Sequence, residues 1–211
     1  MSSNQPSSTS SSTYESVLAS LLPPKSPHVF LTLPISPHKP LIPSHLITTL
    51  SLHPVLESFL HILNLDLSSA HFLLRHMQAA PAFEAMYLHG ILHRIEGDVD
   101  NARAWYRDVK ETDVFRAAWE EGGLERAMDF MGKVEGVKGI VRGGKLNGGD
   151  GEVDEVREES LMELKAVLGF CEIFFGTGKV EDASGVWVSM SEKNKDIAEK
   201  MIAGGEGWRR F

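Results

Sequence analysis

The sequence predicts an all-α protein whose helical hairpins pack as one bundle or a short solenoid. Apolar residues recur at helical spacing from His45 to about Gly132, and again from about Val153. No segment shows the apolar–polar alternation that indicates a half-buried strand. Hydrophobic residues make up 42% of the 211 residues, which is enough to build a buried core around these helices.

The first 44 residues are expected to differ from the helical part. Residues 1–13 are rich in serine and carry no charged side chain, which predicts a disordered tail. Residues 14–44 are expected to form a short helix and a proline-rich strap, because seven of the ten prolines fall between Pro23 and Pro43. Apolar residues between these prolines favour a strap over the core; a ligand for a proline-recognising domain is the alternative.

Residues 45–211 are predicted to form a single helical domain. Pro54 suits the first turn of a helix, Asp66 is a good cap for the next, and Pro81 opens a third. A fourth helix is expected from about Asp98 to Lys110, and two more near 113–121 and 123–134.

Glycines then interrupt the pattern and predict a flexible loop at about 136–152. Helical periodicity resumes at about Val153 and continues to about Ala203, with one break near Gly176 and Gly178.

An internal repeat suggests how the helices pair. Small, glycine, alanine and aromatic residues recur at the same offsets in two segments: Gly90, Gly97, Ala102 and Tyr106, then Cys171, Gly178, Ala183 and Trp187. This spacing resembles the tetratricopeptide hairpin, in which a glycine ends the first helix in a left-handed conformation. We therefore expect irregular tetratricopeptide-like helical hairpins; a bundle with two similar turns is the alternative.

Composition excludes several classes of protein. A net charge of −8 argues against nucleic acid as a partner. No stretch is long and apolar enough to span a membrane, and one cysteine, Cys171, cannot form an internal disulfide. The N-terminus lacks the basic and apolar regions of a secretory signal, so the predicted location is cytoplasmic.

The histidines are the chemical signal in this sequence, since all nine lie between His28 and His93. His89 and His93 share a helix face at i and i+4, Glu96 follows, and His71 lies on the preceding helix. His71, His89, His93 and Glu96 are therefore candidate ligands for a divalent metal such as zinc or iron. The candidate catalytic set adds two polar neighbours and comprises His71, His89, His93, Arg94, Glu96 and Asn101.

Two readings of this cluster need no metal. A buried His–Glu pair can act as general acid and base, with Arg94 holding an anionic group of a substrate. The polar side chains can instead form a hydrogen-bonded network that only fixes the geometry of the hairpin.

A resemblance covers about residues 64–115. The string His89-x3-His93-Arg94-x-Glu96-Gly-Asp98-x2-Asn101-Ala102-x2-Trp105-Tyr106, together with Asp66-x4-His71, is similar to the signature of an uncharacterised family of small helical proteins in fungi and bacteria. That family has no established activity to carry over to these residues. The proline-rich strap and the glycine-rich insert lie outside the signature.

Two functions follow as hypotheses. The first is a protein-interaction or scaffold module that binds a protein partner through a helical groove. The second is a small His-centred enzyme or metal-binding protein that acts on a small molecule. The second predicts that His71, His89, His93 and Glu96 converge within roughly 5 Å, whereas the first predicts a dispersed histidine set.

Overall fold

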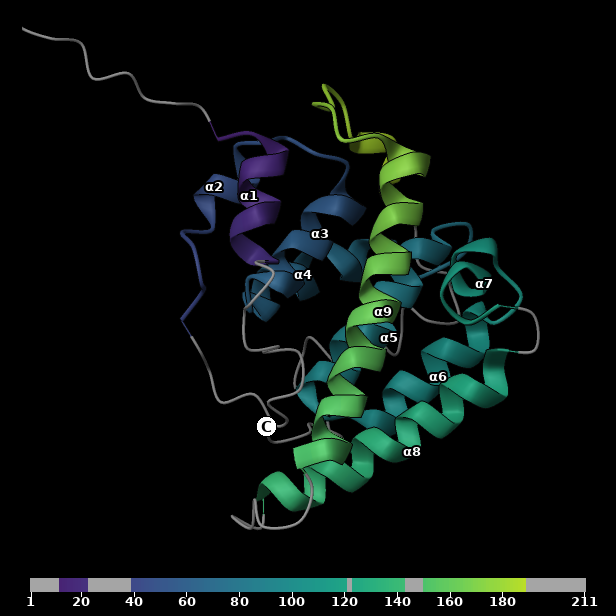
Figure 1. The fold of residues 1–211 in the computed structure, drawn as a ribbon. Coiled ribbons are helices and arrows are strands. Elements are labelled where there is room, and N and C mark those ends of the chain that lie inside the picture. The colour runs from purple at the N-terminus through teal and green to yellow at the C-terminus, as the bar shows by residue number, and fades with distance from the viewer. Residues whose placement is uncertain (1–11, 23–38, 121–122, 143–149, 189–211) are drawn as a thin grey trace, which may run out of the picture.

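The computed structural model describes residues 12–22, 39–120, 123–142 and 150–188. Every regular element in these ranges is a helix, which confirms the all-α prediction (Figure 1). Nearly all of the predicted tail, the proline-rich strap and the helical pattern after 188 lie outside the described residues. No helix within them combines the length and apolar character needed to cross a bilayer.

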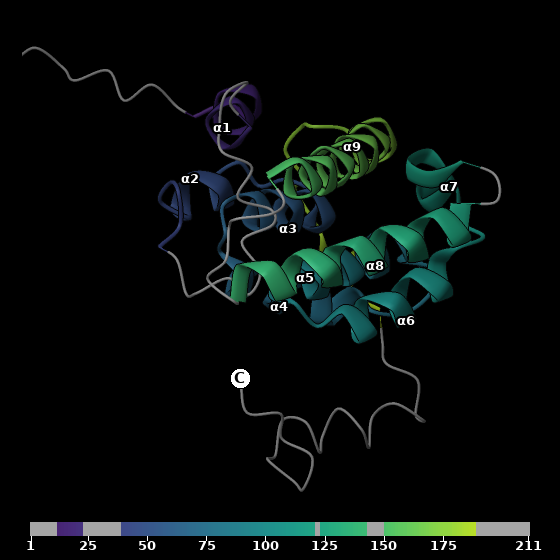
Figure 2. The ribbon, with the colours of Figure 1, turned by 60° about the horizontal axis from the view of Figure 1, so that its bottom comes forward.

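Two short helices begin the described fold. Helix α1 (Tyr14–Leu21) is capped by Thr13, whose side chain accepts a hydrogen bond from the backbone of Ser16. Helix α2 (His45–Thr48) is a single turn that buries Ile47. Both lie at the end of the bundle opposite to helix α7 (Figures 1 and 2).

Helices α3 (Pro54–Leu63) and α4 (Leu67–Leu74) form the first hairpin, followed by the 3₁₀ turn η2 (Arg75–Met77). Pro54 starts α3, and Asp66 caps α4 by accepting a hydrogen bond from the backbone of Ser69 at 3.3 Å. Both predictions are confirmed. Helix α3 is buried over most of its surface and forms part of the core.

The second hairpin joins α5 (Phe83–Glu96) to α6 (Val99–Val109). Gly97 ends α5 with a φ of 85°, in the left-handed region, as predicted. Gly90 lets the two helices approach closely, because a Cβ built there would lie 2.9 Å from Cβ of Trp105. Helix α5 contacts α3, α4, α6 and α7, so it is the central rod of the bundle.

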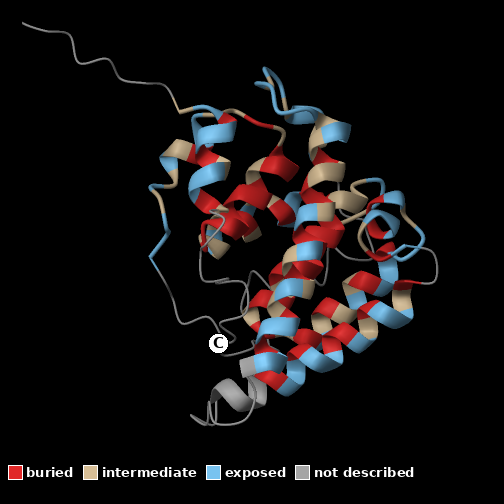
Figure 3. Cartoon of the chain, in the orientation of Figure 1, coloured by how far each residue is buried: buried red, intermediate tan, exposed pale blue. Residues whose placement is uncertain are grey.

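Three further helices cover this pair: α7 (Asp113–Trp119), α8 (Gly123–Arg142) and α9 (Asp150–Phe175). Helix α9 crosses the front of the molecule in Figure 1 and packs on α3, α7 and α8. Buried residues line the faces that the helices turn toward one another, whereas the outer face of α9 is exposed (Figure 3).

The predicted glycine-rich loop at 136–152 is too long. Helix α8 continues through Gly132 and Gly136 to Arg142, and α9 begins at Asp150. Buried Phe130, Val134 and Val137 give α8 an apolar stripe. Their burial outweighs the cost of about 1 kcal/mol for each helical glycine.

The second copy of the repeat does not form a helical hairpin. Helix α9 ends at Phe175, and the left-handed residue is Gly176, with φ 72°, rather than Gly178. The only regular element between there and residue 188 is the 3₁₀ turn η3 (Ser184–Val186). The backbone of this segment instead pairs with residues that flank the first hairpin, because Val180 donates to Ser51, just before α3, and Val188 donates to His76 in η2.

A charged network lies inside the bundle. Arg94 on α5 and Glu163 on α9 are buried, and their side chains form an ion pair at 2.6 Å. The hydroxyls of Tyr87 and Tyr106 donate to the same carboxylate at 2.7 and 2.5 Å. Arg94 also donates to Ser160 at 2.9 Å. Hydrogen bonds thus compensate for the burial of these two charges.

Candidate functional site

Three of the predicted histidines converge. His71 comes from α4, while His89 and His93 come from successive turns of α5. One nitrogen of each lies within 4.8 Å of one nitrogen of each of the others. The ring of His71 lies 5.1 Å from that of His89 and 5.2 Å from that of His93, between centroids. The α3–α4 and α5–α6 hairpins, packed through α4 and α5, bring these rings together.

Glu96 contacts two of these rings from the last turn of α5. Its two carboxylate oxygens lie 3.3 Å from Nδ1 of His71 and 3.3 Å from Nδ1 of His93. Burial alone would raise the pKa of Glu96, but the contacts with His71 and His93 lower this pKa to about 2. Glu96 is therefore an anion at neutral pH, and it leaves the Nε2 atoms of both rings facing away from the carboxylate.

His89 is the buried member of the cluster, with 4% of its surface exposed. Its ring stacks on those of His93 and Trp105, at centroid distances of 4.7 and 4.8 Å. Burial, and then the neighbouring His93 and His71, lower the pKa of His89 to about 2, so its imidazole is neutral.

The nitrogen Nδ1 of His89 is buried without a hydrogen-bond partner among the described residues. The only other such imidazole nitrogen there is Nδ1 of His61, which lies 3.3 Å from a carboxylate oxygen of Asp66. No carboxylate lies within ion-pair distance of His89 in the described part of the chain. Buried polar atoms are rarely left unsatisfied, so this nitrogen is a candidate ligand-binding atom.

Helix α6 closes the cluster with two side chains. Nδ2 of Asn101 lies 3.2 Å from Nε2 of His93, which brings Asn101 into the site as predicted. The prediction missed Trp105, which stacks on His89. The signal was present, because Asn101 and Trp105 are four residues apart and share a face of α6.

Arg94 does not belong to this site, and its predicted role in holding a substrate is wrong. It follows His93 directly, so its side chain leaves α5 about 100° further round the helix. There it pairs with Glu163, and its surface is fully buried. The predicted catalytic set therefore separates into a histidine cluster with Glu96 and Asn101, and a core arginine.

The donor set fits a transition metal with a small adjustment. Nitrogens that coordinate one tetrahedral zinc ion at about 2.1 Å lie about 3.4 Å apart. The present limit of 4.8 Å therefore has to contract by side-chain rotation. Glu96 occupies the position of a carboxylate that orients ligand histidines from outside the coordination shell, rather than the ligand position predicted for it.

Comparisons with known proteins identify no relative. No family model matches the chain, and neither a curated protein nor a solved structure matches it.

Proposed function

We propose that this protein binds a divalent transition metal through His71, His89 and His93. The observation that carries the proposal is the convergence of three imidazoles, one of which, His89, has a buried Nδ1 without a hydrogen-bond partner among the described residues. A neutral imidazole with a free electron pair is the form that coordinates a metal. Glu96 is placed to hold the rings of His71 and His93 in position.

The two metal-free readings fit less well. A network that serves only to fix the hairpin satisfies its own buried atoms, as the one around Glu163 does, whereas Nδ1 of His89 finds no partner in the described part of the chain. A general acid or base needs a pKa near the working pH. Burial would raise the pKa of Glu96, but the contacts with His71 and His93 outweigh burial and lower it to about 2, far from that range.

Three imidazoles select zinc, iron, copper or nickel over magnesium and calcium, which prefer oxygen. Three protein ligands also leave a coordination position for water or a substrate. His71 and His93 keep 17% and 14% of their side-chain surface exposed, so solvent reaches this side of the cluster. A bound metal would there supply an activated water, the chemistry of a small metal-dependent hydrolase.

The test is calorimetric titration of the chelator-treated full chain with Zn²⁺. We expect one equivalent to bind, and His71→Ala or His89→Ala to weaken binding by more than about 100-fold, because losing a ligand costs more than losing its orienting partner. His71 is partly exposed, so its loss disturbs the core little. His45→Ala, at an exposed histidine in α2, is the matched control. If the original chain and the three variants all bind Zn²⁺ equally well, the proposal is wrong.

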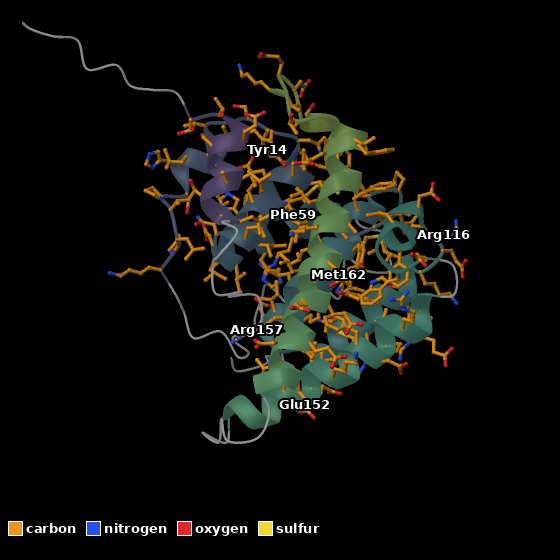
Figure 4. All side chains as sticks on the ribbon, viewed as in Figure 1. Tyr14, Phe59, Arg116, Glu152, Arg157 and Met162 are labelled. Atoms are coloured by element: carbon orange, nitrogen blue, oxygen red, sulfur yellow. The ribbon has the colours of Figure 1, made fainter. Side chains whose placement is uncertain are left out.

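A protein-interaction role in the cytoplasm is the second candidate. The outer face of α9 carries three large apolar side chains, Met162, Ile173 and Phe174, with exposures of 63, 90 and 65% (Figure 4 labels Met162). A groove of about 580 Å³ also lies between α1 and α9, lined in part by Tyr14, Leu18 and Lys165.

A photo-crosslinker at position 173 tests this role in cells. We expect it to capture a discrete partner, and one at exposed Asp154, earlier in α9, to capture none. Identical crosslinks from both positions would argue against a specific surface.

A further inference from the structure

Asn101 is held against Nε2 of His93. The backbone N–H of Asn101 donates a hydrogen bond at 3.3 Å to the carboxylate of Asp98, which is the N-cap of α6. Its side-chain Nδ2 lies 3.2 Å from Nε2 of His93. The Gly97 turn thus fixes the amide against this ring from the next helix.

The proposed metal and Asn101 need the same electron pair. A neutral imidazole has one N–H and one lone pair. A carboxylate oxygen of Glu96 lies 3.3 Å from Nδ1 of His93, a contact that assigns the ring proton to Nδ1. The remaining lone pair, on Nε2, accepts the amide N–H of Asn101. A metal ion on Nε2 therefore has to displace that N–H.

We propose that Asn101 is a built-in competitor of the metal, which holds His93 in the empty site and moves aside when a divalent transition cation binds. This inference rests on the proposed function and adds what sets the affinity of the site. An amide N–H has no electron pair to share, so in the observed orientation Asn101 opposes coordination. Rotating the amide would present its oxygen, a donor that these metals favour less than imidazole nitrogen.

The competition predicts a gain of affinity on removing the amide. For Asn101→Ala we expect Zn²⁺ to bind about fivefold more tightly, the factor that corresponds to one hydrogen bond of about 1 kcal/mol. Asp100→Ala, one residue earlier on the exposed side of α6, is the matched control and should leave the dissociation constant unchanged. In the unaltered protein, the side-chain amide resonances of Asn101 should move on zinc titration as the bond to His93 breaks.

Each outcome decides between the claims. Weaker binding by Asn101→Ala would mean that its amide oxygen is a ligand, and unchanged binding would mean that it has no role; either result overturns the inference. If the inference about Asn101 fails but His89→Ala still weakens zinc binding as predicted, the proposed metal site stands. If the unaltered protein binds no zinc, both proposals fail together. Circular dichroism of Asn101→Ala, with unchanged helix content, confirms that the fold is retained.

Discussion

At the scale of single residues, the surroundings of each ring distinguish the histidines. His45 and His76 are exposed to water, whereas His89 lies between two rings and its Nδ1 has no hydrogen-bond partner among the described residues. The i, i+4 spacing of His89 and His93 could be read from the sequence. Which nitrogen would be left without a partner could not, because it depends on how α4 and α6 pack against α5.

The role of Glu96 gives the first prediction. Glu96→Gln keeps the shape but removes the charge that holds the Nδ1 protons of His71 and His93. We expect zinc affinity to fall by about 10- to 100-fold, the usual cost of losing an orienting partner. Titration calorimetry measures it, with exposed Asp100→Asn as the control for charge alone. A complete loss of binding would instead make Glu96 a direct ligand.

A second prediction concerns acid stability. Burial alone would raise the pKa of Asp66, but hydrogen bonds from Ser44 and Ser69 lower it below its ordinary value of 3.8. A carboxyl whose folded pKa is lowered stabilises the fold above its unfolded pKa, and this contribution is lost as the pH falls.

Asp66→Asn keeps a capping residue and removes this dependence. In urea unfolding, the original chain should be more stable than the variant at about pH 7, and the two should converge as the pH falls through the lowered pKa of Asp66. A difference that stays constant with pH would contradict the assignment.

At the scale of elements, the α5–α6 hairpin shows what the sequence could predict. Gly97 and Asp98 mark its turn by residue type alone, and the structure places both as predicted. The similar string around Gly178 predicted a second hairpin that does not form. The spacing of glycine, alanine and aromatic residues does not indicate which backbone N–H groups bond to other parts of the fold. There the backbone N–H groups of Val180 and Val188 donate to residues on either side of the first hairpin.

The close approach at Gly90 gives the third prediction. A methyl group there would lie 2.9 Å from Cβ of Trp105 and 3.0 Å from the ring of Tyr106. We expect Gly90→Ala to lower the free energy of unfolding by about 1–3 kcal/mol, since α5 and α6 must separate. Gly169→Ala is the control, because nothing lies within 4 Å of a Cβ there. It should gain up to about 1 kcal/mol from helix propensity, and equal effects in the two variants would contradict this packing.

At the scale of the whole molecule, the Arg94–Glu163 pair ties the central helix to α9. The sequence predicted Arg94 as a substrate-binding residue, since it lies next to His93 and close to Glu96 in the chain. Its partner is 69 positions away along the chain, and no local pattern indicates such a pairing. Helical periodicity predicts which residues are buried, but it does not predict which buried charges meet.

This pair gives the fourth prediction. Glu163→Gln leaves the charge of Arg94 buried and unpaired, so we expect stability to fall by about 3–5 kcal/mol. Arg94→Met combined with Glu163→Met should cost less than the sum of the two single changes, because no uncompensated charge remains. Denaturant unfolding of the original chain, of Arg94→Met, of Glu163→Met and of the double variant measures the coupling free energy between the two side chains. Additive costs would show that the two side chains act independently.

The most direct test of the central claim is X-ray absorption at the metal edge of the zinc-loaded full chain. We predict one ion per chain, with three imidazole nitrogens at about 2.0–2.1 Å and one oxygen ligand, such as water, in the remaining position. His89→Ala should lose this pattern, and His45→Ala should keep it. An absorption spectrum without imidazole ligands, or one that His89→Ala leaves unchanged, would contradict the account.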